Sequence, residues 1–116
     1  MRTIQFYRLP DGECPVEIFL NALPGKQVQK VVWVLRLIEE LERVPSQYFK
    51  KLVNTEGIWE IRVQLGTDAF RFLGFFAEPT VLVLTNGFAK KTQKTPTKEI
   101  ATALRRRAEY IAERKP

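Results

Sequence analysis

The sequence contains no histidine and a single cysteine among its 116 residues. Zinc sites of the usual Cys/His type are therefore excluded, and Cys14 has no partner for an intrachain disulfide, which fits a reducing compartment. The N-terminal residues 1–6 lack the apolar region of a secretory signal. No apolar run approaches the roughly 18 residues that span a bilayer. We therefore expect a cytoplasmic protein that has no membrane contact, metal or cofactor.

The size and composition of the chain are those of an ordinary folded domain. Its length predicts one domain over residues 1–116. A hydrophobic content of 45% and an aromatic content of 11% supply a modest core. We find no internal repeat, no low-complexity stretch and no linker.

The net charge of +6 is concentrated in the last quarter of the chain. Residues 1–87 contain equal numbers of basic and acidic side chains. Residues 88–116 contain nine Lys and Arg residues against Glu99, Glu109 and Glu113. A basic end of this kind favours phosphate groups or an acidic protein as the partner.

Hydrophobic periodicity and turn residues predict the order strand, two helices, three-stranded meander, helix. The expected strands are residues 3–8, 58–65, 69–76 and 80–88, and the expected helices are residues 15–23, 26–43 and one that begins at Thr95-Pro96. This order predicts an α+β fold with a mostly antiparallel sheet, two N-terminal helices packed on one face and a C-terminal helix. We expect the helices to cover one face and leave the other free. Residues 44–51 are expected to form a loop.

The second expected helix has a wider apolar stripe than one contact surface needs. Trp33, Val34 and Leu37 lie beside the regular helical positions. Deep burial explains this width, and so does a docking surface for a partner protein.

The expected hairpin at residues 58–76 sets two arginines side by side. Gly66-Thr67 predicts a two-residue type II′ turn, because glycine readily adopts the positive φ of its first position. Arg62 then lies directly across from Arg71, and like charges at such positions cost about 0.2–1 kcal/mol. Either both are solvated surface side chains, splayed apart or balanced by Glu60, or they form a clamp that binds phosphate oxygens bidentately.

Two other basic segments are weaker candidates. Residues 88–96 combine three lysines with hydroxyl and amide groups and lead into a helix N-terminus, which suits phosphate. A solvated loop explains the same composition. Arg105, Arg106 and Arg107 fan around a helix, so we interpret them as surface charge.

Several segments together resemble the RelE/ParE toxin superfamily in its HigB-like, phage-derived branch. The resemblance runs from about residue 15 to residue 110, and the run at residues 87–96 is highly specific. It is carried by Pro15-Val16-Glu17-Ile18-Phe19-Leu20, Ile58-Trp59-Glu60-Ile61-Arg62-Val63, Phe70-Arg71-Phe72 and Gly87-Phe88-Ala89-Lys90-Lys91-Thr92-Gln93-Lys94-Thr95-Pro96-Thr97-Lys98-Glu99-Ile100.

This resemblance implies a RelE-like microbial RNase fold and the toxin of a toxin–antitoxin system, which cuts mRNA on the ribosome. It also implies a small helix-turn-helix antitoxin as partner. By this similarity, catalysis is expected at Arg62, Arg71, Lys51 and Lys91, and RNA binding at Lys90, Thr92, Gln93, Lys94 and Lys98. The chain departs from the family at Phe70, where tyrosine is frequent, and at Asn86, where histidine is frequent.

The expected chemistry is attack of the substrate 2′-hydroxyl on the adjacent phosphorus, which requires no metal. The arginines suit the negative charge of the phosphorane. With no histidine, lysine is the remaining cationic group for proton transfer, and neighbouring positive charge lowers the pKa of a lysine such as Lys51, Lys90 or Lys91. Two alternatives remain open: a ParE-like DNA gyrase poison without nuclease activity, and a catalytically silent RNA-binding protein.

Overall fold

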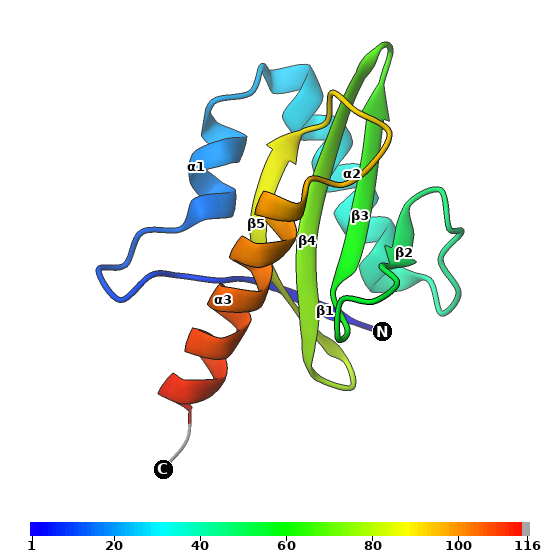
Figure 1. The fold of residues 1–116 in the computed structure, drawn as a ribbon. Helices are drawn as coiled ribbons and strands as arrows, with labels where there is room; N and C mark the ends of the chain where they lie inside the picture. The colour runs from blue at the N-terminus through cyan, green and yellow to red at the C-terminus, as the bar shows by residue number, and fades with distance from the viewer. Residues whose placement is uncertain (115–116) are drawn as a thin grey trace.

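The computed structural model of the protein describes residues 1–114 and is α+β, with a five-stranded mixed sheet and three helices (Figure 1). The predicted order of elements is confirmed, with one strand added. In chain order the elements are β1 (Thr3–Phe6), α1 (Pro15–Asn21), α2 (Gly25–Glu40), β2 (Phe49–Lys51), β3 (Trp59–Leu65), β4 (Asp68–Glu78), β5 (Val81–Ala89) and α3 (Thr97–Glu113).

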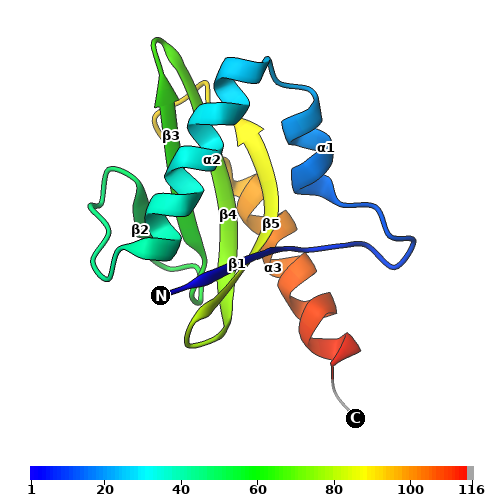
Figure 2. The same ribbon diagram turned by 180° about the vertical axis from the view of Figure 1, so that it is seen from behind.

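The strands are arranged in the order β1-β5-β4-β3-β2. The pairs β2/β3, β3/β4 and β4/β5 are antiparallel, whereas β1 is parallel to β5. Figure 2, which shows the molecule from behind, has β1 in front, beside β5. The sheet is therefore mostly antiparallel, and its two long central strands β4 and β5 carry most of its pairing.

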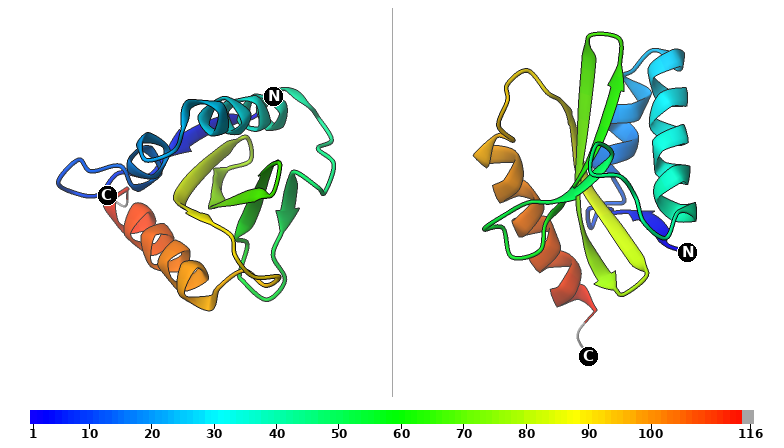
Figure 3. Two further views of the ribbon diagram at one scale, coloured as in Figure 1. Left: turned by 90° about the horizontal axis from the view of Figure 1, so that it is seen from above. Right: turned by 90° about the vertical axis from the view of Figure 1, so that its right-hand side faces the viewer.

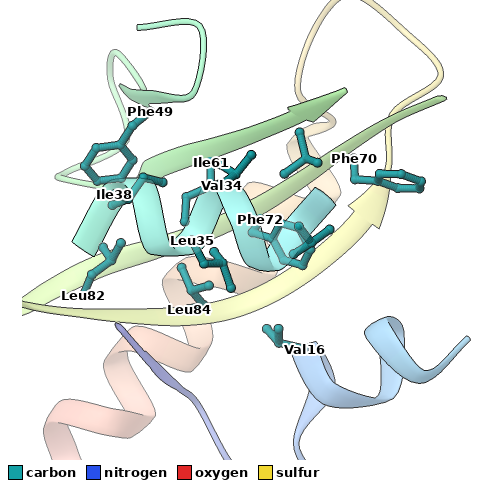
Figure 4. Close-up of a cluster of buried hydrophobic side chains, with 12 residues drawn as sticks. Val16, Val34, Leu35, Ile38, Phe49, Ile61, Phe70, Phe72, Leu82 and Leu84 are labelled. Carbon is teal, nitrogen blue, oxygen red and sulfur yellow. The ribbon is translucent and has the colours of Figure 1, made fainter. Parts of the chain in front are cut away.

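The larger hydrophobic core lies between the sheet and the two N-terminal helices. Val31, Val34 and Ile38 of α2 are fully buried against Ile61 and Phe72 of the sheet (Figure 4). At about 25 cal/mol for each Å² of apolar surface removed from water, each such side chain contributes roughly 1.5–3 kcal/mol. The odd-numbered residues of β3 therefore point toward α2, and its even-numbered residues point to the opposite face.

The opposite face carries α3, so the expectation of a free face is wrong (Figure 3). Ala103 is fully buried there in a second core with Leu73, Phe75 and Val83. The physical reason is that β4 and β5 are apolar on both sides and need cover on both. Contacts from α3 reach β4 and β5, and the hairpin end of β3 and β4 lies beyond the helix (Figure 1).

Polar contacts at three points fix α3 to the sheet. Asn86 donates its amide to Glu99 Oε1 at 2.9 Å. Arg106 donates to the carbonyl oxygen of Thr85 at 2.8 Å. The hydroxyl of Tyr7 donates to Glu109 at 2.7 Å, and burial together with this carboxylate raises the pKa of Tyr7 to about 12. The interpretation of Arg106 as surface charge is therefore wrong, because its guanidinium spans from the helix to β5.

A bulge in β5 changes the register of the sheet next to this attachment. Leu73 pairs with Asn86 but Gly74 pairs with Leu84, so Thr85 is the extra residue. Its hydroxyl donates to the carbonyl of Leu73 at 3.1 Å. The inserted residue lets Leu84 face α2 while Asn86 faces α3, although two such positions would share a face in a regular strand.

The short strand β2 replaces part of the expected loop at residues 44–51. Its three residues pair with β3, with Phe49 opposite Ile61 and Lys50 opposite Glu60. Within residues 1–114, no helix combines the length and the apolar character needed to cross a membrane.

Candidate functional site

The turn between β3 and β4 sets the register of the candidate site. Gly66 has a positive φ of 62°, whereas Thr67 is not among the positive-φ residues, as a type II′ turn requires. Leu65 pairs with Asp68, and Arg62 lies directly opposite Arg71. The predicted hairpin register is confirmed. Both arginines project from the α3 face, beyond the end of that helix.

A buried carboxylate holds the two arginines in place. Glu60 is fully buried and accepts a hydrogen bond from Arg62 Nε at 3.0 Å. Arg71 Nε lies 3.8 Å from the same carboxylate oxygen. The hydroxyl of Thr95, near the end of the loop at residues 90–96 (the lysine loop), donates to the other oxygen of Glu60. Glu60 therefore connects the hairpin to the segment that precedes α3.

The arginines are neither fully solvated nor fully neutralised. The side chain of Arg62 is 31% exposed and that of Arg71 is 12% exposed. Arg71 donates through a terminal nitrogen to the carbonyl of Phe70 at 3.0 Å, but its buried Nε has no hydrogen-bond partner among the described residues. Burial lowers the pKa of Arg71, and Arg62 lowers it further against the opposing effect of Glu60. An anion would relieve this excess of positive charge.

Lys90 is the third cation at this point of the sheet. Its backbone N–H donates to the carbonyl of Ala69 at 2.8 Å, which fixes the start of the lysine loop beside β4. Burial lowers the pKa of the Lys90 ammonium, and the positive charges of Arg71 and Arg62 lower it further. The sequence analysis predicted RNA binding for this residue and named it among the lysines that could transfer a proton. Its position also suits proton transfer, because a lysine with a lowered pKa loses its proton more readily.

Two hollows open on either side of Arg71. The first, which we call the Tyr48 hollow, has a volume of about 380 Å³ and is lined by Lys30, Gln47, Tyr48, Arg62, Val63, Gln64 and Arg71. The second, the Lys90 hollow, has a volume of about 390 Å³ and is lined by Ala69, Arg71, Lys90, Lys91, Thr92 and Gln93. Neither lining includes a carboxylate. Arg71 is thus placed to contact a ligand that occupies both hollows.

A search of curated proteins finds no match to the chain. A family model described as Phage derived protein Gp49-like (DUF891) matches residues 18–108, which is most of the chain. The chain belongs to this Gp49-like family. Membership is consistent with the toxin of a toxin–antitoxin pair.

The structure brings together many, but not all, of the residues predicted for the site of this Gp49-like chain. Arg62 and Arg71 are adjacent, and Lys90, Lys91, Thr92 and Gln93 share a hollow with Arg71. Lys94 and Lys98 are exposed and line neither hollow.

Lys51 does not join the arginines. It pairs with Trp59, and directly paired residues project from the same face, so it lies on the α2 side. Lys50 is opposite Glu60 and therefore projects from the arginine face.

The two departures from the RelE/ParE pattern do not alter the arginine pair. Phe70 points away from Arg71 into the α1 side of the sheet, where its ring lies 6.1 Å from that of Phe19. Asn86 is buried under α3 and uses its amide to bind Glu99. Neither side chain reaches the guanidinium groups of Arg62 and Arg71. A tyrosine at position 70 or a histidine at position 86 would therefore have to point in another direction to transfer a proton beside these arginines.

Sequence reasoning missed the roles of four residues at the site. Thr95 lies in the predicted basic segment at residues 88–96, but its contact with Glu60 carried no signal, because it joins residues 35 positions apart. Tyr48 and Lys30 come from a turn and a helix that meet only at the edge of β3. The position of Lys50 follows from the pairing of a three-residue strand, which is too short to show alternation.

Proposed function

We propose that this Gp49-like protein is a RelE/ParE-type toxin of the HigB-like branch, with a RelE-like microbial RNase fold, that cleaves mRNA on the ribosome. The observation that carries the proposal is the group of three cations, Arg62, Arg71 and Lys90, around the single buried carboxylate of Glu60. Such a group suits a phosphodiester better than a neutral substrate. The partner that restrains it is a small helix-turn-helix antitoxin.

The arginines stabilise the charge that develops during cleavage. The 2′-oxygen of the substrate attacks the adjacent phosphorus, and the bond from phosphorus to the 5′-oxygen breaks. The products are a 2′,3′-cyclic phosphate and a free 5′-hydroxyl. Arg62 and Arg71 donate to the nonbridging oxygens, whose negative charge is greatest in the phosphorane. Glu60 holds both side chains in advance, so little reorganisation accompanies the reaction.

Two protons move in this reaction, and lysines of the Lys90 hollow are the candidates to carry them. Lys90 in its neutral form removes the proton of the 2′-hydroxyl. Lys91 lines the same hollow and its ammonium group gives a proton to the departing 5′-oxygen. RNA supplies its own nucleophile, so the residues have only to align the 2′-oxygen, stabilise charge and transfer these protons.

The products formed by the wild-type protein on translating ribosomes test this proposal. We expect mRNA fragments that end in a 2′,3′-cyclic phosphate and begin with a 5′-hydroxyl, which are distinguished by their reactivity toward polynucleotide kinase. A parallel assay measures DNA supercoiling by gyrase. Inhibited supercoiling with intact mRNA would identify a gyrase poison, and ribosome binding without product would identify a silent RNA-binding protein.

The pH dependence of cleavage tests the role of Lys90. Because the pKa of Lys90 is lowered, its neutral form increases as pH rises toward that value, and the cleavage rate should rise with it and then level off. Lys90→Met should lower the rate by about 10²-fold or more and abolish this rise. Lys26→Met, at an exposed position on α2, is the matched control and should keep the wild-type profile. An unchanged pH profile in Lys90→Met would assign proton transfer to another group.

A further inference from the structure

The Tyr48 hollow reaches around an open edge of the sheet. β2 pairs with β3 only from Trp59 to Ile61, and the backbone N–H of Arg62 adds one hydrogen bond to the carbonyl of Tyr48 at 2.8 Å. Beyond that point, no strand within residues 1–114 covers this edge of β3. The hollow therefore connects the arginine face with the α2 face.

Aromatic and cationic side chains line the α2 side of this edge. Tyr48 packs against Trp33 with ring centroids 5.8 Å apart and an interplanar angle of 72°. The Nζ atom of Lys30 lies 4.5 Å from the centre of the Trp33 ring. Val34 is fully buried and Leu37 is half-buried, so burial explains part of the extra width of the apolar stripe on α2, but Trp33 is 49% exposed. Trp33 thus presents an exposed aromatic surface beside Tyr48.

Tyr48 is held firmly in place, and its side chain packs partly against the larger core. The backbone of Tyr48 is fixed at both ends, since its N–H donates to the carbonyl of Pro45 at 2.9 Å and its carbonyl accepts from Arg62. Rigid attachment lowers the entropic cost of binding at this position. The hollow also contains the amide groups of Gln47 and Gln64, each of which can both donate and accept hydrogen bonds.

The lining distinguishes between possible ligands. It contains three cationic side chains, two amides and one aromatic ring, with Val63 as the one aliphatic residue and no carboxylate. A protein-docking surface would be more apolar at its centre. Aromatic rings beside cations are the means by which proteins bind single-stranded nucleic acid, because every base has a face that stacks.

We propose that the Tyr48 hollow is a nucleobase subsite for single-stranded RNA. Tyr48 stacks on the base adjacent to the phosphate held by Arg62 and Arg71, and Gln47 and Gln64 contact the edge of that base. Lys30 binds the next phosphate along the strand. This inference rests on the proposed function, since it extends the same RNA across the edge of β3.

Binding of a short 2′-O-methyl RNA, which cannot be cleaved by 2′-oxygen attack, tests the subsite by fluorescence anisotropy at low salt. Tyr48→Leu should weaken binding by about 5- to 150-fold, the range for loss of one stacked base. Tyr48→Phe keeps the ring and should bind within about twofold of the wild type. An RNA with an abasic position in this subsite should bind the wild type and Tyr48→Leu equally.

A spectroscopic measurement keeps the test decisive if Tyr48→Leu does not fold. In Trp59→Phe, Trp33 is the remaining tryptophan, and RNA should quench its fluorescence with the same midpoint as the anisotropy change. Unchanged affinity in a folded Tyr48→Leu variant, or no quenching, would overturn the subsite. Loss of binding to a helix-turn-helix antitoxin with unchanged RNA affinity would overturn it in favour of a protein interface.

These outcomes are separate from those of the cleavage assay. If the wild type forms no cleavage products but Tyr48→Leu still loses RNA affinity, the nuclease proposal fails and the subsite stands. If cleavage products form but Tyr48→Leu binds RNA normally, the subsite fails and the nuclease proposal stands. Failure of the wild type to bind RNA at all would overturn the subsite.

Discussion

Replacement of Arg71 by alanine is expected to lower the rate of mRNA cleavage on translating ribosomes by about 10²- to 10³-fold, the usual effect of removing one preorganised donor to a developing oxyanion. Arg71 lines both hollows and is the less exposed of the two arginines. Its Nε is buried and lies 3.8 Å from the carboxylate of Glu60, which leaves the terminal nitrogens of the guanidinium as the donors for a phosphate. Single-turnover cleavage with excess protein measures this rate directly.

Arg105→Ala is the matched control for Arg71→Ala. It removes the same charge from an exposed position on α3 and should leave the rate within about twofold of the wild type. Arg71→Lys keeps the charge but loses the planar fork, so it should recover only part of the loss. Retention of more than a tenth of wild-type activity by Arg71→Ala would contradict the assignment of this arginine to the reacting phosphate.

Replacement of Glu60 by alanine should lower the free energy of unfolding by about 3 kcal/mol. The carboxylate is fully buried, and its loss leaves Arg62 and Arg71 facing each other without a counterion. We expect the lower end of the usual range for broken buried pairs, because Arg62 is still in contact with water. Urea denaturation followed by circular dichroism measures the change.

Two further variants separate the charge of Glu60 from its shape. Glu60→Gln keeps an acceptor for Thr95 and should lose less stability than Glu60→Ala. Glu78→Ala removes an exposed glutamate from β4 and should change the free energy of unfolding by no more than about 0.5 kcal/mol. A loss below about 1 kcal/mol in Glu60→Ala would mean that the arginines separate and become solvated when the carboxylate is gone.

The hairpin and its arginine pair could be predicted from the sequence because local chemistry determines them. Gly66 selects the turn, the turn sets the register, and alternation then places Arg62 beside Arg71. The α+β class followed for a similar reason, since each helix shows its own apolar period. Contacts that depend on neighbouring residues in the chain are visible in the sequence.

The face covered by α3 could not be predicted in the same way. The apolar stripe of α3 shows that one side is buried, but it does not specify which side of the sheet receives it. β4 and β5 carry apolar residues on both faces and so accept a helix on either. The choice depends on long-range polar contacts such as Asn86 with Glu99 and Tyr7 with Glu109.

The lysines show a second limit of sequence reasoning. Lys50 and Lys51 are adjacent, and a single step of strand register decides which of them faces the arginines. β2 has three residues and no turn residue that sets its pairing with β3. Arg106 was wrongly interpreted as surface charge because its acceptor is a backbone carbonyl of β5. Every residue has such a carbonyl, so the sequence does not show which one an arginine binds.

The contact between Thr95 and Glu60 also imposes an order on biosynthesis. The chain is made from its N-terminus, so the arginine hairpin leaves the ribosome before Lys90 and Thr95 do. The carboxylate of Glu60 then lacks its hydroxyl partner, and the third cation is missing. The site on a nascent chain therefore stays incomplete until Lys90 and Thr95 have been synthesised. Under the proposed function, a new molecule acts only after these two residues have joined the hairpin.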